Sequence, residues 1–519
     1  MAGQIEMPFT TMIAVMLTLS LILQNNLLCS QATEGHENED KQTIDTEFMK
    51  AVFGGIGPVM NPPDIKTEEE GKISPRIKKH QKKPEQIHIA YGSQPSEMVV
   101  MWSTAVETAS TVLYGLAPRN YTLSTHGQCV SFTLGNPSGL QYIHRVQLTD
   151  LIPGQNYSYK IQTDDGVYSD EFLMKTMTEG EDWSPNLLVY GDMGRVGGAP
   201  SLKLLTKEAL SGRIDAAIHV GDFAYDLHTE GGKYGDDFMN RIQELATRIP
   251  YMTTVGNHEI PYSFSHYRYR FSMPNLPWPT PEEKMWYSFN IGKAHFISYS
   301  TEVYFTNGPI ESHYQWLLDD LREANKPENR SRRPWIIAYG HRPMYCSNVD
   351  GDDCTKADSI VRAGLEELFF NQGVDIIIQG HEHSYERLWP VYKDKVFTTN
   401  YSNPRAPIHI ISGSAGCNEF DGVCVNPMLG PRGDWSAFRA WLPGLYGFGK
   451  LNIVNSTHVH WEQILALNGQ VIDSAWIEQQ HHGPFKLSEE EEKDLLKDKN
   501  EEDLNFLREW LDDDEFFTT

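Results

Sequence analysis

The chain has 519 residues, of which 40% are hydrophobic, so it is long enough for two or three domains and too apolar to be disordered throughout. Its formal net charge of −26 argues against broad electrostatic binding to DNA or RNA, because phosphate backbones attract basic surfaces. A small anionic substrate is still compatible with this charge, since a bound metal ion reverses the sign of the local field.

The N-terminus predicts a leader for the secretory route. An apolar run over residues 11–23 is too short to span a bilayer and has the length of a signal-peptide core, although its flank carries Glu6 and no Lys or Arg. We therefore expect residues 1–32 to be a signal peptide, with an uncleaved anchor as the alternative. No later run is long and apolar enough for a transmembrane helix, so we expect no stable membrane insertion.

Five N-glycosylation sequons support the same route, because this modification belongs to secreted proteins. Their asparagines are Asn120, Asn156, Asn329, Asn400 and Asn455. Together with the leader, they predict a glycoprotein that is secreted or lysosomal.

Six cysteines fit an oxidising compartment. Four of them form two close pairs, each flanking a turn-rich stretch, which predicts two local disulfides. The predicted pairs are Cys346–Cys354 and Cys417–Cys424. Cys29 falls in or beside the leader, which leaves Cys129 as an odd thiol. A zinc–cysteine site is disfavoured, because the sequence has no C-x-x-C pair.

Residues 33–84 are rich in charge, Pro and Gly and predict a linker or pro-segment. Short alternating strands separated by turn residues follow over residues 85–178, where a Pro-Gly turn leads into a Tyr-x-Tyr strand. This pattern resembles a fibronectin type III β-sandwich, and nothing in it looks catalytic. We expect its strands at residues 86–90, 98–102, 111–114 and 144–148.

From residue 184 to about 480, apolar strands alternate with helical stretches, which predicts an α/β domain with helices on the faces of a layered sheet. We expect strands at 186–190, 216–220, 251–255, 294–299, 335–339 and 374–379, and more within 407–416 and 447–464. We expect helices at 201–210, 314–325 and 359–370. Residues 485–519 form an acidic tail, in which Leu504, Leu507 and Leu511 recur at helical spacing. A solvated tail is the first interpretation and a partner-binding helix the alternative.

Five of the predicted α/β strands end in Gly followed by Asp, Asn or His. The stretches are Gly191-Asp192, Gly221-Asp222-Phe223-Ala224-Tyr225, Gly256-Asn257-His258-Glu259, Gly340-His341 and Gly380-His381-Glu382-His383. Ligands of α/β sheets bind outside the carboxyl ends of the strands, so we expect these residues to converge. Each Gly permits a sharp turn and the close approach of a ligand.

The side chains in these stretches offer carboxylate, phenol, amide and imidazole donors but no thiolate, and this mixture suits iron, zinc or manganese. The seven candidate ligands are Asp192, Asp222, Tyr225, Asn257, His341, His381 and His383. Seven donors are too many for one ion, and a carboxylate can bridge two, so the sequence predicts a dinuclear centre with metals about 3.5–4 Å apart. Each short stretch alone is explained by a turn, a cap or a core aromatic as well as by a metal ligand. Five such stretches, each at a strand end, are better explained by a metal site.

The five stretches, in this order, resemble the blocks of the metallophosphoesterase superfamily. The tyrosine at position 225 narrows the resemblance to the purple acid phosphatases, in particular their long-chain animal members, and the similarity covers residues 85–475. The fold implied is a fibronectin type III-like sandwich followed by a layered α/β metallophosphoesterase domain. The resemblance implies that a ferric ion is held by Asp192, Tyr225 and His383. It implies that a divalent ion, which is iron, zinc or manganese, is held by Asn257, His341 and His381. Asp222 would bridge the two ions.

The resemblance also implies a function, the hydrolysis of small phosphate monoesters at acid pH. The metals would lower the pKa of a bound water and so provide the attacking hydroxide. His258 would be catalytic, steadying the phosphate or protonating the leaving oxygen, with a purely structural hydrogen bond as the alternative. Two other functions remain open: a phosphodiesterase or nucleotide pyrophosphatase with the same metals, and a non-catalytic binding protein on the same scaffold.

One loop departs from the family pattern. Plant members carry additional histidines after the ligand that corresponds to His341, whereas residues 342–356 contain none. The leaving-group acid and the substrate preference are therefore open, and Asp350, Asp352 or Asp353 are candidates to face the substrate. For His266 we expect a rim or structural role. The oligomeric state is not determined by the sequence.

Overall fold

The structure is a computed structural model that describes residues 81–133, 140–163, 166–417, 430–440 and 446–497. The chain divides between residues 72 and 73, and every described residue belongs to the second part. The predicted signal peptide, most of the linker, Cys29, Cys424 and the leucines of the acidic tail lie outside the described residues. Within the described ranges, no helix has the length and apolarity needed to cross a bilayer.

The N-terminal part is a β-sandwich of two four-stranded antiparallel sheets, as the strand pattern predicted. One sheet has the order β1 (Glu85–Tyr91), β2 (Met98–Thr104), β6 (Gln141–Leu148) and β5 (Gln128–Phe132). The other has the order β4 (Leu123–His126), β3 (Thr111–Leu116), β7 (Asn156–Gln162) and β8 (Phe172–Lys175). Large apolar side chains such as Trp102 and Tyr159 are buried in its core, which accounts for the alternation in the sequence.

The strands of the α/β domain divide between two sheets. The six-stranded sheet has the order β11 (Tyr251–Thr254), β10 (Ala216–Val220), β9 (Asn186–Tyr190), β21 (Gly447–Ile453), β22 (His458–Leu465) and β23 (Val471–Glu478). The seven-stranded sheet has the order β12 (Tyr287–Ile291), β13 (Ala294–Ser298), β14 (Trp335–Tyr339), β15 (Ile376–Gln379), β19 (Ile408–Ser412), β16 (Tyr385–Leu388) and β20 (Ser436–Ala440). A short hairpin pairs β17 (Val391–Tyr392) with β18 (Lys395–Val396).

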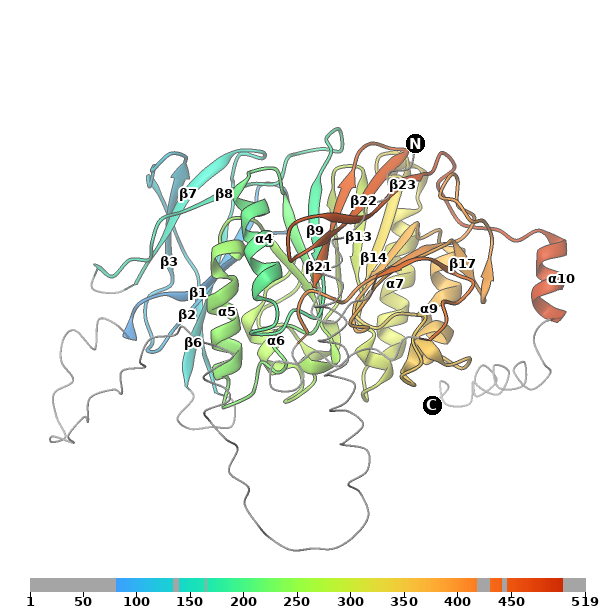
Figure 1. The fold of residues 1–519 in the computed structure, drawn as a ribbon. Helices are drawn as coiled ribbons and strands as arrows, with labels where there is room; N and C mark the ends of the chain where they lie inside the picture. Colours follow the sequence, from blue (N-terminus) through green and yellow to red (C-terminus); the bar gives the residue numbers. More distant parts are fainter. Residues whose placement is uncertain (1–80, 134–139, 164–165, 418–429, 441–445, 498–519) are drawn as a thin grey trace, which may run out of the picture. The chain divides into compact units, whose positions relative to one another are not determined.

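The α-helices of the described residues are α4 (Ala199–Leu210), α5 (Lys233–Ala246), α6 (Ser265–Arg270), α7 (Ile310–Ala324), α8 (Pro327–Arg330), α9 (Ile360–Asn371) and α10 (Glu489–Lys497). Helices α4, α5, α7 and α9 cover the outer faces of these sheets, whereas α10 lies at the edge of the molecule (Figure 1). Alternate residues of β14 face opposite ways: Ile337 belongs to the main core with β9 and β10, whereas Ile336 packs with Leu317 of α7 and Leu365 of α9. Both faces of β14 are buried, which explains its uninterrupted apolar sequence.

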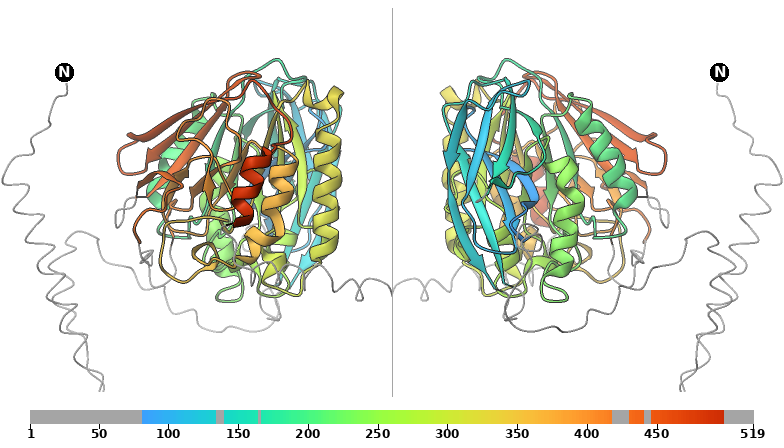
Figure 2. Two further views of the ribbon diagram at one scale, coloured as in Figure 1. Left: turned by 90° about the vertical axis from the view of Figure 1, so that its right-hand side faces the viewer. Right: turned by 90° about the vertical axis from the view of Figure 1, so that its left-hand side faces the viewer.

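The sandwich is bound to the α/β domain through α5, which lies beside the blue strands in the right-hand view of Figure 2. The backbone N–H groups of Gln86 and Ile87 in β1 donate to side chains of α5, at 3.2 and 2.9 Å. The side chain of Gln86 also accepts from the buried guanidinium of Arg270 (2.8 Å), which begins the connection to the α/β loops. Apolar residues of both parts belong to one continuous core, so the two parts pack as a single body.

Candidate metal centre

The motif-bearing strands are neighbours, and their carboxyl ends meet. Strands β9, β10 and β11 run parallel in one sheet, and β14 and β15 run parallel in the other. Backbone hydrogen bonds join the loops: Gly191 N–H donates to the carbonyl of Ser412 in the opposite sheet (2.9 Å), and Gly380 N–H donates to the carbonyl of His341 (2.8 Å). The loops after these strands are therefore held together where the two sheets meet, as the sequence predicted for a strand-end site.

A first group of side chains is rich in oxygen. The Tyr225 hydroxyl lies 3.2 Å from Asp192 Oδ1 and 2.9 Å from His383 Nε2. His383 Nε2 lies 3.6 Å from the same Asp192 oxygen. Three loops thus bring a phenol, a carboxylate and an imidazole nitrogen to one point.

A second group, rich in nitrogen, lies beside the first. His341 Nε2 lies 3.0 Å from Asn257 Oδ1, 3.2 Å from Asp222 Oδ2 and 3.2 Å from His381 Nδ1. The ligand atoms of Asp222, His341 and His381 all lie within 4.8 Å of one another. The backbone N–H of His381 donates to Asp192 Oδ2 (2.9 Å), which connects the two groups. All seven predicted ligands are thereby brought together.

The chemistry of the second group fits a cation. His341 Nδ1 lies 2.8 Å from the carbonyl oxygen of Val220, which can only accept, so the ring proton belongs on Nδ1 and Nε2 carries a lone pair. That lone pair faces two side-chain oxygens and a second imidazole nitrogen. Atoms that all offer electron pairs repel one another unless a positive charge lies between them.

The pKa values of the buried candidate ligands also indicate that a positive charge is stabilised at this site. Burial raises the pKa of Asp192 well above its usual range, although His341 lowers it. Burial also raises the pKa of Asp222, but His341 and His258 bring it below its usual range. Burial lowers the pKa of His341, while Asp222 raises it to about 10. The protein groups therefore hold protons where metal ions would replace them, and metal binding is expected to release protons.

The backbone around the site is held in an unusual conformation. Four of the candidate ligands have positive φ: Asp192 (58°), Asp222 (54°), Tyr225 (47°) and His381 (68°). Each such residue costs about 1–3 kcal/mol and persists only where the surrounding fold enforces it, which is typical of functional sites. A Cβ on Gly256 would lie 2.2 Å from Asp222 Oδ1, and one on Gly380 would lie 2.5 Å from Asp192 Oδ2. No larger residue fits at these two glycines while the carboxylates keep their positions.

His258 lies at the rim of the site with its ring 24% exposed. Its backbone N–H donates to Asp222 Oδ1 (3.0 Å), and its Nδ1 lies 2.5 Å from Asp226 Oδ1. Its Nε2 is directed to the site, 3.9 Å from Asp222 Oδ2. Burial lowers the pKa of His258, but Asp222 and the bond with Asp226 raise it to about 9. The ring packs edge-on against Tyr225, at 4.5 Å between centroids.

The sequence reasoning missed the buried carboxylate of Glu259. Its Oε2 accepts from the backbone N–H of Asp222 and of Gly256, both at 2.9 Å, and its Oε1 accepts from that of Phe223 (3.1 Å). Glu259 thus binds the loop after β10 to the loop after β11. The available signal was the spacing of Gly256 and Glu259, which is that of a capping box.

The sequence motifs also did not identify Arg342 as a residue of the site. Its Nε donates to both oxygens of the fully buried Glu302 (3.0 and 3.2 Å), and its guanidinium lies over the ring of Phe305, 4.1 Å from the centroid. It adds a fixed positive charge beside the nitrogen-rich group. The sequence signal that could have identified it is its place directly after the candidate ligand His341.

The remaining candidates lie as follows. His266 is buried between Arg270, whose Nε donates to its Nδ1 (3.2 Å), and the ring of Phe132 in the sandwich, so its role is structural. Asp353 accepts hydrogen bonds from the first residues of α9 and does not face the site. Asp352 contacts His381.

Among the described residues, Cys346 and Cys354 form a disulfide, Cys129 is free, and Cys417 is disulfide-bonded. The predicted partner of Cys417, Cys424, lies outside the described residues.

Comparisons with known proteins agree with this geometry. Residues 84–176 match the family model for the purple acid phosphatase N-terminal domain, residues 185–385 that for calcineurin-like phosphoesterases, and residues 406–474 that for the iron/zinc purple acid phosphatase-like protein C region. The chain is similar to acid phosphatase type 7 of Danio rerio (46% identity over 77% of this chain and 92% of that protein) and of Homo sapiens (43% identity, 76% and 90%).

Among solved structures, a purple acid phosphatase from yellow lupin seeds (Lupinus luteus) has a similar fold. The TM-score is 0.66 at 24% identity, and the match covers 77% of this chain and 75% of that one.

Glu259→Gln tests whether the Glu259 carboxylate stabilises the protein by binding the loop after β10 to the loop after β11. The amide keeps one acceptor oxygen and turns its NH₂ toward a backbone N–H, so we expect a loss of about 2 kcal/mol in the free energy of unfolding. Denaturant unfolding is measured at about pH 8, above the pKa of about 7 that burial and Asp222 give Glu259. Glu311→Gln, at an exposed position in α7, is the control and should be neutral. Equal stability of both variants would contradict the role of Glu259.

Proposed function

Since this chain belongs to the purple acid phosphatase family and is a metal-dependent phosphoric monoester hydrolase, we propose that it is an acid phosphatase of the secretory pathway with a mixed Fe(III)–M(II) centre. The divalent ion is iron, zinc or manganese. The observation that carries this proposal is the division of the converging side chains into an oxygen-rich group containing a phenol and a nitrogen-rich group of amide and imidazoles.

The division matches the preferences of the two ions. A hard ferric ion prefers anionic oxygens, which Tyr225 and Asp192 supply together with the imidazole of His383. A divalent ion accepts the softer donors of Asn257, His341 and His381. Asp222 is suited to bridge, because its Oδ2 is near His341 Nε2 and its charge acts on Asp192 as well. When bound, the metal pair neutralises phosphate oxygens and activates a water for attack on phosphorus.

The chain contributes the groups that orient the substrate and move its proton. Asp226 fixes the ring of His258 through Nδ1, which leaves Nε2 directed to the site. From this position Nε2 is placed to hold a proton and deliver it to the leaving oxygen. Because loop 342–356 has no histidine, His258 is the imidazole best placed for this step. The expected substrates are small phosphorylated molecules, in keeping with a chain of net charge −26.

The secretory proposal is supported by the exposure of the sequons. Asn156, Asn400 and Asn455 are exposed, and Asn120 and Asn329 are partly exposed. The disulfide between Cys346 and Cys354 is also typical of an oxidising compartment.

Hydrolysis assays test the activity. We expect the purified protein to hydrolyse an aryl phosphate monoester faster than an aryl diester, best at acid pH, and Asp222→Asn to lose at least about 100-fold in kcat/KM because the bridging charge is removed. Asp358→Asn, an exposed position with the same change of charge, should behave as the wild type. A preference for the diester would contradict the substrate class. Inactive protein that holds two metals would favour a binding protein.

Tyr225→Phe tests the ferric assignment. A phenolate bound to Fe(III) absorbs visible light by charge transfer, so the variant is expected to lose the visible band, and absorption spectra with elemental analysis measure this. Tyr262→Phe is the matched control, because Tyr262 is 61% exposed and lies outside the ligand set. A band that survives in Tyr225→Phe would show that another group binds the iron.

Glycosidase treatment tests the compartment. Protein collected from the medium of secreting cells is expected to gain electrophoretic mobility on deglycosylation, and Asn455→Gln is expected to remove the mass of one glycan. Asn468→Gln, exposed but outside any sequon, should leave the mobility unchanged. Protein that stays in the cytosol and shows no shift would contradict the secretory route.

A further inference from the structure

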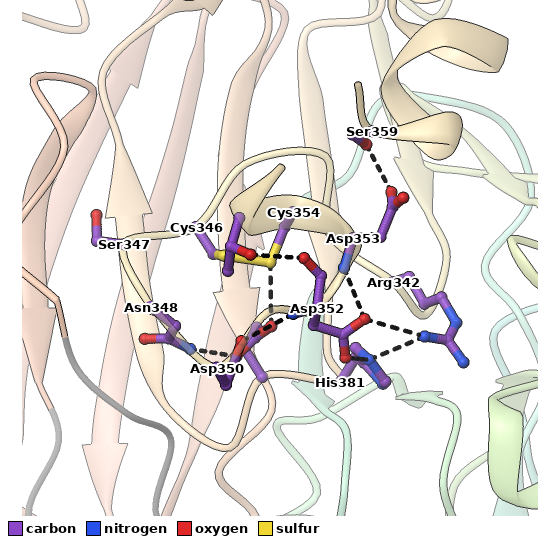
Figure 3. The surroundings of a disulfide bond; sticks show 12 residues. Arg342, Cys346, Ser347, Asn348, Asp350, Asp352, Asp353, Cys354, Ser359 and His381 are labelled. Carbon is purple, nitrogen blue, oxygen red and sulfur yellow. Dashed lines mark hydrogen bonds and ion pairs between the residues drawn. A yellow bond between two sulfur atoms is a disulfide. The ribbon is translucent and has the colours of Figure 1, made fainter. Parts of the chain in front are cut away.

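The loop after His341 is closed by the Cys346–Cys354 disulfide and lies against the His381 side of the site (Figure 3). Asp353 fixes one end of the loop, because its carboxylate accepts from Ser359 Oγ (2.5 Å) and from the backbone N–H of Ile360 (3.0 Å) at the start of α9. The other end is held by Ser347, which donates to Glu386 through its backbone N–H (3.0 Å) and its hydroxyl (2.6 Å). The loop therefore has a defined position relative to the site.

The carboxylate of Asp352 points from this loop to His381 (Figure 3). Its Oδ2 contacts His381 Nε2. Its Oδ1 accepts from the backbone N–H of Asp353 (2.7 Å) and from Arg342 Nη1 (3.4 Å). Asp352 is 34% exposed, so it lies at the edge of the site rather than in its interior.

The two nitrogens of His381 have opposite surroundings. Nδ1 faces His341 Nε2 and the nitrogen-rich group, whereas Nε2 faces Asp352. Nδ1 can bind a metal only when the ring proton is on Nε2. Arg342 Nη1 lies 3.1 Å from the same Nε2 and can only donate, so alone it would favour the tautomer with the proton on Nδ1.

We propose that Asp352 is a positioning residue for the divalent-metal ligand His381: its carboxylate holds the ring proton on Nε2 against the competing Arg342 and so keeps Nδ1 free to bind the ion. This inference rests on the proposed function. A carboxylate behind a metal-binding histidine raises the basicity of the ligand and fixes its ring. For His341 the same task is performed by the backbone carbonyl of Val220. Arg342 is held in place by Glu302, so it remains a competitor for His381.

Asp352→Asn separates this role from a structural one. Oδ1 already accepts two donors, so the amide oxygen of the variant takes that place and the NH₂ group replaces Oδ2 beside His381 Nε2. The hydrogen bond to the ring is thereby reversed, which favours the tautomer that cannot bind metal. Asn caps a helical turn as well as Asp does, so the loop is expected to keep its conformation.

The experiment compares the wild-type holoenzyme with Asp352→Asn and with Asp358→Asn, an exposed control on the same segment. Release of the divalent ion to a chelator is followed together with the Fe(III) content, the visible band and the unfolding temperature. We expect Asp352→Asn to release the divalent ion about 10–100-fold faster, with the Fe(III) content, the visible band and the unfolding temperature unchanged. Asp358→Asn is expected to match the wild type.

Release at the wild-type rate from Asp352→Asn would overturn the inference. Loss of both metals together with a lower unfolding temperature would also overturn it, because the loop would then act through packing. The proposed function fails separately, when the wild-type protein itself does not hold two metal ions or hydrolyses no phosphate ester.

Discussion

The mutual repulsion of buried electron-pair donors is the constraint on which this fold depends. Asp192 and Asp222 are 0% and 1% exposed and act on each other electrostatically, and two imidazoles direct lone pairs to the same region. Such a cluster is costly to assemble from a flexible chain, because these groups lose water and mostly offer one another acceptors rather than donors. The protein meets this cost with rigid neighbours: the backbone N–H groups of His258 and His381 donate to the two carboxylates, and the carbonyl of Val220 fixes His341.

The two-sheet architecture makes this rigidity possible. Parallel strands deliver their following residues to one edge, and the backbone hydrogen bond from Gly191 to Ser412 at the end of β19 joins the two sheets there. Glu259 gathers three N–H groups from two loops and so couples β10 to β11. Positive φ at the candidate ligands is tolerated because the strands before them are almost entirely buried, and local relaxation would disrupt the core.

Much of this could be predicted from sequence, for physical reasons. Strands β9, β10 and β14 begin and end where their apolar runs do, because both faces of each strand are covered. Helix α5 was missed: it begins after paired glycines and is strongly polar, although Phe238, Ile242 and Leu245 recur at helical spacing. The division of the strands between two sheets, with β21 beside β9, depends on contacts distant in the chain, and so do the partners of Glu259 and Asp352. Local patterns could predict which candidate ligands converge but not the groups that orient them.

The sandwich supplies none of the candidate ligands, but it contacts the segment that follows His258. After His258 the chain makes a turn with three consecutive residues at positive φ, Tyr262 (59°), Ser263 (54°) and Phe264 (55°), and then enters α6. Helix α6 ends in Arg270, which donates to Gln86 of the sandwich and pairs with Asp236 of α5 (2.9 Å). The strained turn is therefore held between the metal site at one end and the sandwich at the other. Because His258 is at the start of this segment, the contacts of Arg270 with the sandwich and with α5 help to fix the backbone that follows His258.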